Sequence, residues 1–105
     1  MIIINDIPWL IAFVPAYSDE LRRPNGELSY GVCDGYYQTI FINEQLSGDL
    51  LRDVLCHELV HAAMFSYGVS LSVEQEELIA SLITTYGEEI IEITNKIFNK
   101  LKERY

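Results

Sequence analysis

The sequence predicts an α+β fold: a minimal single domain in which a small antiparallel sheet of about three strands packs on a central helix and a long C-terminal helix. One observation behind this prediction is that short runs rich in Ile, Val and aromatic residues, separated by turn signals, fill the chain up to Ile42. The other is that apolar residues recur at helical spacing from Asp49 onward. Strands and helices in separate blocks are typical of the α+β class.

Size and charge narrow the classes of function. The chain has 105 residues, and 50% of them are hydrophobic, which suffices for one core. We therefore interpret residues 1–105 as a single domain. The 7 Lys and Arg residues against 16 Asp and Glu residues give a net charge of −9. Such a surface repels phosphate backbones, so we expect no direct nucleic-acid partner.

The apolar N-terminus, Met1 to Ile4, is predicted to be a strand. It has no basic n-region, and Asn5, Asp6 and Pro8 interrupt it too early for a signal peptide or a membrane span. We therefore expect a cytoplasmic protein that does not associate with a membrane.

The two cysteines, Cys33 and Cys56, are too few for a disulfide framework. Cys56 lies in a helical apolar pattern, and we expect both thiols to be reduced. Cys33 is considered as an extra metal ligand, but the C-x-x-C spacing typical of thiolate sites is absent.

A second strand is predicted from Ile7 to Val14, because this run combines Ile, Trp, Phe and Val. Pro15 closes it, since proline cannot donate to a sheet ladder. The polar stretch from Ser18 to Glu27 is typical of a surface loop, and its adjacent Arg22 and Arg23 are interpreted as solvated side chains.

A hairpin is predicted farther along the chain. Two runs rich in aromatic and β-branched residues, Leu28 to Cys33 and Tyr36 to Ile42, are separated by Asp34-Gly35, a strong hairpin signal.

The central helix is predicted over Asp49 to Tyr67. Ser47 is the expected N-cap, and Gly68 is well placed to be the left-handed residue that ends the helix. The apolar positions at helical spacing are Leu50, Leu51, Val54, Leu55, Leu59, Ala62 and Phe65.

A second helix is predicted from about Val73 towards the C-terminus. Ser72 to Gln75 matches a capping box, and Gly87 lies in the helix interior, where it can introduce a kink. The large apolar side chains define the face that we expect to be buried: Leu78, Ile79, Leu82, Ile83, Tyr86 and Ile90.

The central helix carries the sequence His57-Glu58-Leu59-Val60-His61, which uses both histidines of the chain. Residues four apart lie on the same helix face, so His57 and His61 can direct two imidazoles at one zinc ion. Glu58 lies about 100° around the helix, close enough to act as the general base on a water molecule without being a ligand.

A catalytic zinc ion commonly has three protein ligands, and no third histidine exists. The nearest downstream candidates, Glu74, Glu76 and Glu77, lie at the start of the second helix. Helical geometry places Glu76 towards the edge of the expected buried face and Glu77 nearly opposite, over Ala80 and Thr84. We therefore predict Glu76 as the third ligand, with Glu77 as the main competitor.

These segments, in this order, resemble small phage and prophage metallopeptidases of the ImmA/IrrE group and, more loosely, SprT-like proteins. The resemblance is carried by Gly31–Asp34, Gln38–Ile42, Leu55–Ala62 and Glu76–Ile79, and it spans roughly Trp9 to Ile90. It implies a minimal zincin-like, gluzincin-like fold in the cytoplasm of a bacterial host, with one zinc ion held by two histidines and a glutamate of the following helix. Those ligands map to His57, His61 and Glu76, and Glu58 maps to the catalytic glutamate.

We therefore expect a zinc-dependent metallopeptidase that hydrolyses peptide bonds of a protein or peptide substrate. If strand Tyr36 to Ile42 lies at the sheet edge, it can bind an extended substrate by strand addition. The substrate and the oligomeric state are left open. The residue that stabilises negative charge on the substrate also stays open among Tyr30, Tyr36, Tyr37, Tyr67 and Tyr86.

Two other functions compete with this one. The chain can be a catalytically idle zincin-fold module that binds a host or phage protein stoichiometrically, but such a module has no need of Glu58, which is present. The motif can also be a chance helix stripe without metal. That reading places two histidines and a glutamate on a partly buried face without partners, which is costly.

Overall fold

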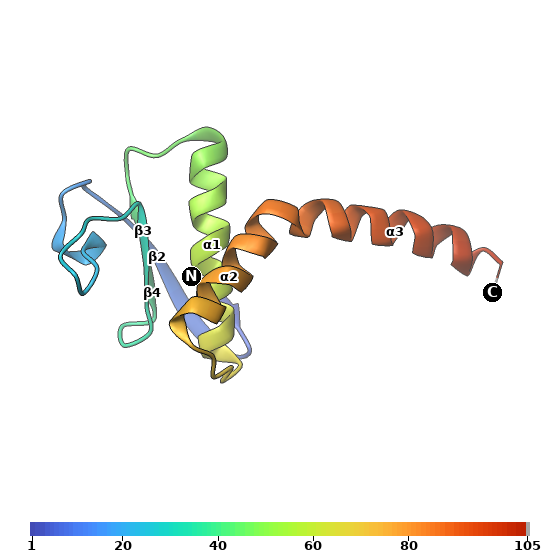
Figure 1. Ribbon diagram of the computed structural model, residues 1–105, viewed down its shortest axis with the longest axis horizontal. Helices are drawn as coiled ribbons and strands as arrows, with labels where there is room; N and C mark the ends of the chain where they lie inside the picture. Colours follow the sequence, from blue (N-terminus) through green and yellow to red (C-terminus); the bar gives the residue numbers. More distant parts are fainter. Residues whose placement is uncertain (105) are drawn as a thin grey trace.

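The computed structural model describes residues 1–104, and it confirms the α+β class with a long C-terminal helix (Figure 1). Its strands are β1 (Ile2–Ile4), β2 (Ile7–Val14), β3 (Gly31–Asp34) and β4 (Thr39–Asn43). Its helices are the 3-10 helix η1 (Asp19–Leu21), α1 (Gly48–Ser66), α2 (Val73–Leu82), the π-helix η2 (Ile83–Gly87) and α3 (Glu88–Lys102).

The sheet has four strands in the order β1-β2-β4-β3, and it is mixed, so the prediction of about three antiparallel strands is wrong. β1 with β2 and β3 with β4 are antiparallel hairpins, but β2 and β4 pair in parallel. Residues 15–30 carry the chain past the β4 position to the far edge, where it enters β3 and returns through β4. Alternation within each run predicts a strand but does not determine its direction.

The edge position that strand addition at Tyr36 to Ile42 requires is not observed, because β4 lies between β2 and β3. Four of the five β4 residues are buried, as expected of a central strand that is apolar on both faces. The hairpin itself is confirmed, but its loop spans residues 35–38. The Asp34 carboxylate accepts the backbone N–H groups of Tyr36 and Tyr37 at 2.9 and 3.1 Å, which stabilises this longer loop.

The core lies between the sheet and α1. It is formed by Trp9, Ile40, Ile42 and Ala62, which have no exposed surface. The indole of Trp9 donates a buried hydrogen bond of 2.8 Å to the Ser66 hydroxyl, which ties the last turn of α1 to β2. Helix α1 also contacts β3, β4 and β1, so it packs against the sheet at more than this one point.

The ends of α1 agree only in part with the prediction. Gly68 has a φ of 66° just beyond the helix, as expected of a left-handed C-terminal residue. Ser47 occupies the N-cap position, but its side chain makes no capping hydrogen bond.

The second helix begins as predicted, because the side chain of Ser72 accepts from the Gln75 backbone and the side chain of Gln75 accepts from the Ser72 backbone. Its expected buried face is wrong. Ala80 is the one fully buried residue of α2, whereas Leu78 and Leu82 are 63% and 50% exposed. The small Ala80 lets α2 approach α1 closely, which the larger side chains do not allow.

The chain changes direction between α2 and α3, and α3 extends away from the rest of the molecule (Figure 1). The π-helix η2 lies at this junction. Gly87 is the last residue of η2, and its backbone has ordinary right-handed helical angles. A π-helical turn between two α-helical segments is a known cause of helix bending. None of the described helices combines the length and the apolar character needed to cross a bilayer.

Candidate metal centre

The two histidines of α1 lie on one face of the helix, as predicted, with ring centroids 5.0 Å apart. His57 and His61 are both partly buried, with 24% and 13% of their side-chain surfaces exposed. The face that carries them looks towards the N-terminal part of α2, where the two glutamates Glu76 and Glu77 lie.

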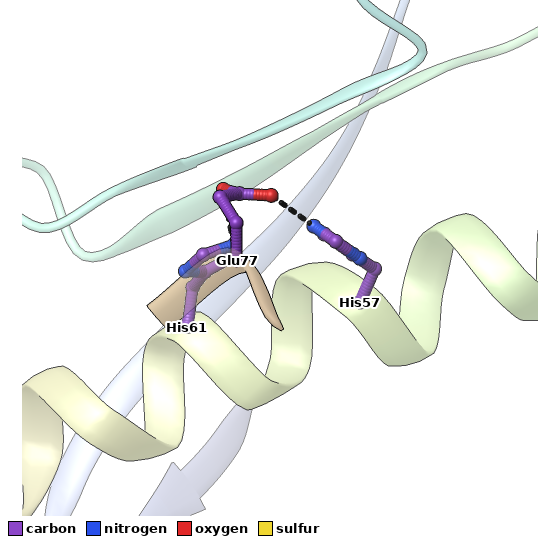
Figure 2. Close-up of side chains that lie close together, drawn as sticks. All are labelled: His57, His61 and Glu77. Atoms are coloured by element: carbon purple, nitrogen blue, oxygen red, sulfur yellow. Dashed lines mark hydrogen bonds and ion pairs between the residues drawn. The ribbon is translucent and has the colours of Figure 1, made fainter. Parts of the chain in front are cut away.

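Glu77 is the glutamate that the structure brings together with both imidazoles (Figure 2). Its Oε2 lies 2.9 Å from His57 Nε2, and its Oε1 lies 3.0 Å from His61 Nε2. One ligand atom from each of the three residues falls within 4.8 Å of the others. This group could therefore hold a metal ion.

Glu76 occupies a different place from the one predicted for it. Its Oε1 lies 2.6 Å from His61 Nδ1, the nitrogen on the other side of that ring. An ionised carboxylate has no proton to give, so Nδ1–H is the donor and the Nε2 atom of His61 is left to face Glu77. Glu76 thus contacts the side of the His61 ring that faces away from Glu77.

The packing of α2 explains why both glutamates reach α1. Neighbouring residues on a helix lie about 100° apart, so they straddle a face instead of sharing one direction. The buried face of α2 includes Ala80, one turn after Glu76 and Glu77, and this face directs the two carboxylates to either side of His61. The prediction ranked the faces of this helix by large apolar side chains, and that ranking did not place Glu77 near the histidines.

The donor set fits a zinc ion. Two imidazole nitrogens and one carboxylate are ligands that zinc accepts, and ligand atoms on a tetrahedral zinc ion lie roughly 3.3 Å apart. The Nε2 atoms of His57 and His61 both face oxygens of Glu77 at a similar distance. A metal ion bound between these atoms would accept the lone pairs of both nitrogens and of the Glu77 carboxylate together.

Glu58 lies beside this group and is 8% exposed. Burial raises the pKa of its carboxyl above the ordinary value, and the nearby Glu77 adds to this, whereas His61, His57 and Arg23 act in the opposite direction. A carboxylate whose charged form is disfavoured holds a proton more readily than an exposed glutamate does. This property suits a group that takes up a proton and releases it again.

A cleft of about 310 Å³ opens over His57, His61, Glu58 and Glu77, and β3 forms one of its walls. Gly31 of β3 is essential to this close approach, because a Cβ atom there would lie 2.8 Å from Val54 Cγ1 and 3.1 Å from Glu58 Cγ. The sequence identified Gly31 as part of a motif, but only the structure reveals its contact with α1.

Cys33 also lines the cleft. Burial, together with the negative charges of Glu58, Glu76 and Asp34, raises the pKa of its thiol to about 12. The metal-binding form of cysteine is the thiolate, which is scarce at neutral pH with such a pKa. Cys33 is not in the group of His57, His61 and Glu77.

Arg23 is the residue that sequence reasoning missed. Its side chain is exposed, as interpreted, but it also lines the cleft and a smaller hollow of about 210 Å³ that Glu58 lines too. Tyr30 lines the smaller hollow, and the other four tyrosines considered above line neither. The tertiary fold places η1, which directly precedes residues 22–28, in contact with β3, and the sequence pattern does not show this contact.

Comparisons with protein-family models, curated proteins and solved structures found no match to this chain.

Proposed function

We propose that the chain is a zinc-dependent peptidase. The observation that carries the proposal is the convergence of two imidazole Nε2 atoms and the Glu77 carboxylate in a cleft that also contains the buried Glu58. The set provides nitrogen and oxygen ligands, an adjacent group able to carry a proton, and room for a substrate.

In this proposal the ligands are His57, His61 and Glu77, and Glu76 orients His61. The distances favour Glu77 over the predicted Glu76, because Glu77 faces the Nε2 atoms of both rings and Glu76 faces Nδ1 of one. A carboxylate on the far nitrogen of a metal-bound histidine is a common companion of zinc sites, since it fixes the ring and raises its basicity.

The chemistry needs only one proton carrier from the protein. Zinc, when bound, supplies Lewis acidity that lowers the pKa of a coordinated water molecule to about 7 and polarises a carbonyl group. The Glu58 carboxylate accepts the proton of the attacking water and delivers it to the leaving amine. Glu77 and the imidazoles keep their places during both steps.

The proposed substrate is an extended peptide that pairs with β3, the strand at the edge of the sheet beside the cleft. The Asn43 N–H donates to the Tyr30 carbonyl at 2.9 Å. Hydrogen-bonded residues alternate along an antiparallel strand, so the backbone N–H and C=O of Val32, two residues after Tyr30, also point towards β4. By the same alternation the backbone N–H and C=O of Cys33 point away from β4. They are free to bind a substrate strand.

Arg23 is proposed as the donor that stabilises negative charge on the substrate carbonyl. It is the one arginine or lysine among the residues that line the cleft in a strongly acidic protein, and it also lines the smaller hollow together with Glu58. Guanidinium groups suit this task because they present several N–H donors in a fixed plane.

The experiment compares wild-type protein with Glu58→Gln. Both are expected to bind one zinc ion, measured by metal analysis after dialysis. Wild-type protein is expected to cleave internal bonds in a mixture of peptides from a digested bacterial lysate, read by mass spectrometry, whereas Glu58→Gln is expected to cleave none of them. Zinc-loaded Glu58→Gln that matches the wild-type rate would remove Glu58 from the mechanism.

A His57→Ala variant completes the test, because loss of a ligand should abolish stoichiometric zinc binding. If the wild-type protein binds zinc but cleaves nothing, the chain is a zinc-binding module and the peptidase proposal is wrong. If the wild-type protein binds no zinc, both parts of the proposal are wrong.

A further inference from the structure

Helix α3 exposes a row of large apolar side chains. No residue of α3 is buried in the described chain, and the helix extends away from the sheet and α1 (Figure 1). Six aliphatic and aromatic side chains of α3 are between 45% and 58% exposed: Ile90, Ile91, Ile93, Ile97, Phe98 and Leu101.

These side chains lie on one face. At about 100° per residue, the six fall within roughly 160° of the helix circumference. Glu92 and Asn99 lie on the opposite face. A stripe of this width normally packs against a neighbour, and a contiguous apolar surface of this kind indicates an interaction site.

The charges of α3 identify the neighbour. The N-terminal part carries Glu88, Glu89 and Glu92, and the C-terminal part carries Lys96, Lys100 and Lys102. The two residues that follow the helix, Glu103 and Arg104, carry opposite charges. Two copies side by side in parallel would place like charges together. Two copies in antiparallel orientation place the acidic end of each helix against the basic end of the other.

We propose that α3 pairs in antiparallel orientation with α3 of a second copy of this chain. A pairing centred on Asn95 brings Ile93 of one copy opposite Ile97 of the other, and it brings Ile90 near Leu101. The two-fold axis repeats every contact.

The same register also pairs the flanking charges. Glu88 and Lys102 lie at one border of the apolar stripe, and Glu89 and Lys100 lie at the other border. Glu89 falls beside Lys100 of the second copy, and Glu88 falls beside Lys102. Glu88 also contacts Arg52 of its own chain, so Glu89 and Lys100 make the cleaner test. This pairing does not depend on the proposed peptidase function.

The test measures the mass of the full chain by sedimentation equilibrium up to about 1 mM protein. Wild-type protein is expected to form dimers. Glu89→Lys and Lys100→Glu are each expected to weaken dimerisation about tenfold, because each replaces two attractive pairs per dimer by repulsive ones. An equimolar mixture of the two variants is expected to restore the dimer, since their flanking charges are complementary.

Glu92→Lys is the matched control, because it changes the net charge by the same amount on the opposite face of α3. It should dimerise as wild-type protein does. Ile97→Asp should be monomeric with an unchanged circular dichroism spectrum, since Ile97 is already 54% exposed. Monomeric wild-type protein, a mixture that does not recover, or equal effects of Glu89→Lys and Glu92→Lys would overturn the proposal. Monomeric wild-type protein that binds vesicles of anionic lipid would assign the face to a membrane surface instead.

Discussion

Two adjacent residues of α2 have distinct tasks at the candidate metal centre. Glu77 faces the Nε2 atoms of both imidazoles, whereas Glu76 contacts Nδ1 of His61. In the proposed function this is the difference between a ligand and the residue that orients a ligand. The difference can be measured, because loss of each type of residue weakens metal binding to a different degree.

We expect Glu76→Gln to weaken zinc binding by roughly 10-fold to 100-fold, the usual effect of removing a carboxylate that orients a ligand. Glu77→Gln should weaken it by considerably more, since it removes a charged ligand. Competition titrations with a zinc-chelating dye give both affinities. Glu74→Gln is the control, because Glu74 is an exposed residue of the same helix turn. The reverse order of Glu76 and Glu77 would restore the ligand set predicted from the sequence.

Because the carboxyl group of Glu58 is buried, we expect the free energy of unfolding to fall as the pH rises. Its pKa is raised in the folded chain, so between the ordinary and the raised pKa the folded state binds more protons than the unfolded state. The free energy of unfolding therefore falls as pH rises through that interval. Glu58→Gln removes this term and should be more stable than wild-type protein at pH 8, but not at pH 4.

Urea unfolding of metal-free protein in EDTA at the two pH values measures this difference. Glu27→Gln is a suitable control, because Glu27 is an exposed residue of the loop that precedes β3. A Glu58→Gln variant that is no more stable than wild-type protein at pH 8 would contradict the expected cost of burying this charge.

At the scale of elements, the approach of α2 to α1 depends on a small side chain. Ala80 is fully buried, and the large apolar residues Leu78 and Leu82 face outward. This packing sets the position of Glu76 and Glu77 one turn earlier. Helix spacing and metal binding are therefore coupled.

We expect Ala80→Leu to reduce the free energy of unfolding by about 1–3 kcal/mol, the usual cost of overpacking a filled interface. It should also weaken zinc binding, because it moves Glu77 away from the histidines. Leu78→Ala is the matched control: it changes an exposed residue of the same helix and should shift stability by about 0.5 kcal/mol or less. Urea unfolding and the dye competition assay provide the two measurements, and equal effects of the two variants would contradict this account of the interface.

Local signals predicted most of the elements. The capping box at Ser72 and the left-handed Gly68 determined where helices begin and end, and the His57–His61 motif placed two imidazoles on one face. The parallel pairing of β2 with β4 was not predicted, and the sequence predicted Glu76 as the ligand, whereas the structure groups Glu77 with the two histidines. Both depend on contacts between segments far apart in the sequence, and periodicity within one segment carries no information about them.

At the scale of the molecule, a metal ion at this centre would link α1 to α2 across the turn at residues 67–72. The two helices would then resist separation through the ligands as well as through the contact at Ala80. Binding to the folded state alone stabilises a protein in proportion to the logarithm of the ligand concentration.

Zinc should therefore raise the thermal midpoint of unfolding, and chelation should lower it. At 100 times the dissociation constant the stabilisation is about 2.7 kcal/mol, which for a domain of this size corresponds to roughly 10–20 °C. Differential scanning calorimetry with zinc and with EDTA measures the shift. The His57→Ala variant should show none, and an equal shift in that variant would place the responsible zinc elsewhere.

The parallel contact between β2 and β4 has a consequence for folding kinetics. Each antiparallel hairpin, β1–β2 and β3–β4, closes over a short loop and can form early, in microseconds. The contact between them joins Leu10 with Thr39 and Val14 with Asn43, across about thirty residues, so its loop-closure entropy is paid later. We expect docking of the two hairpins to limit the folding rate. Until they dock, the edge of β4 that β2 will cover is open to β2 of another molecule, which is the route to a domain-swapped dimer.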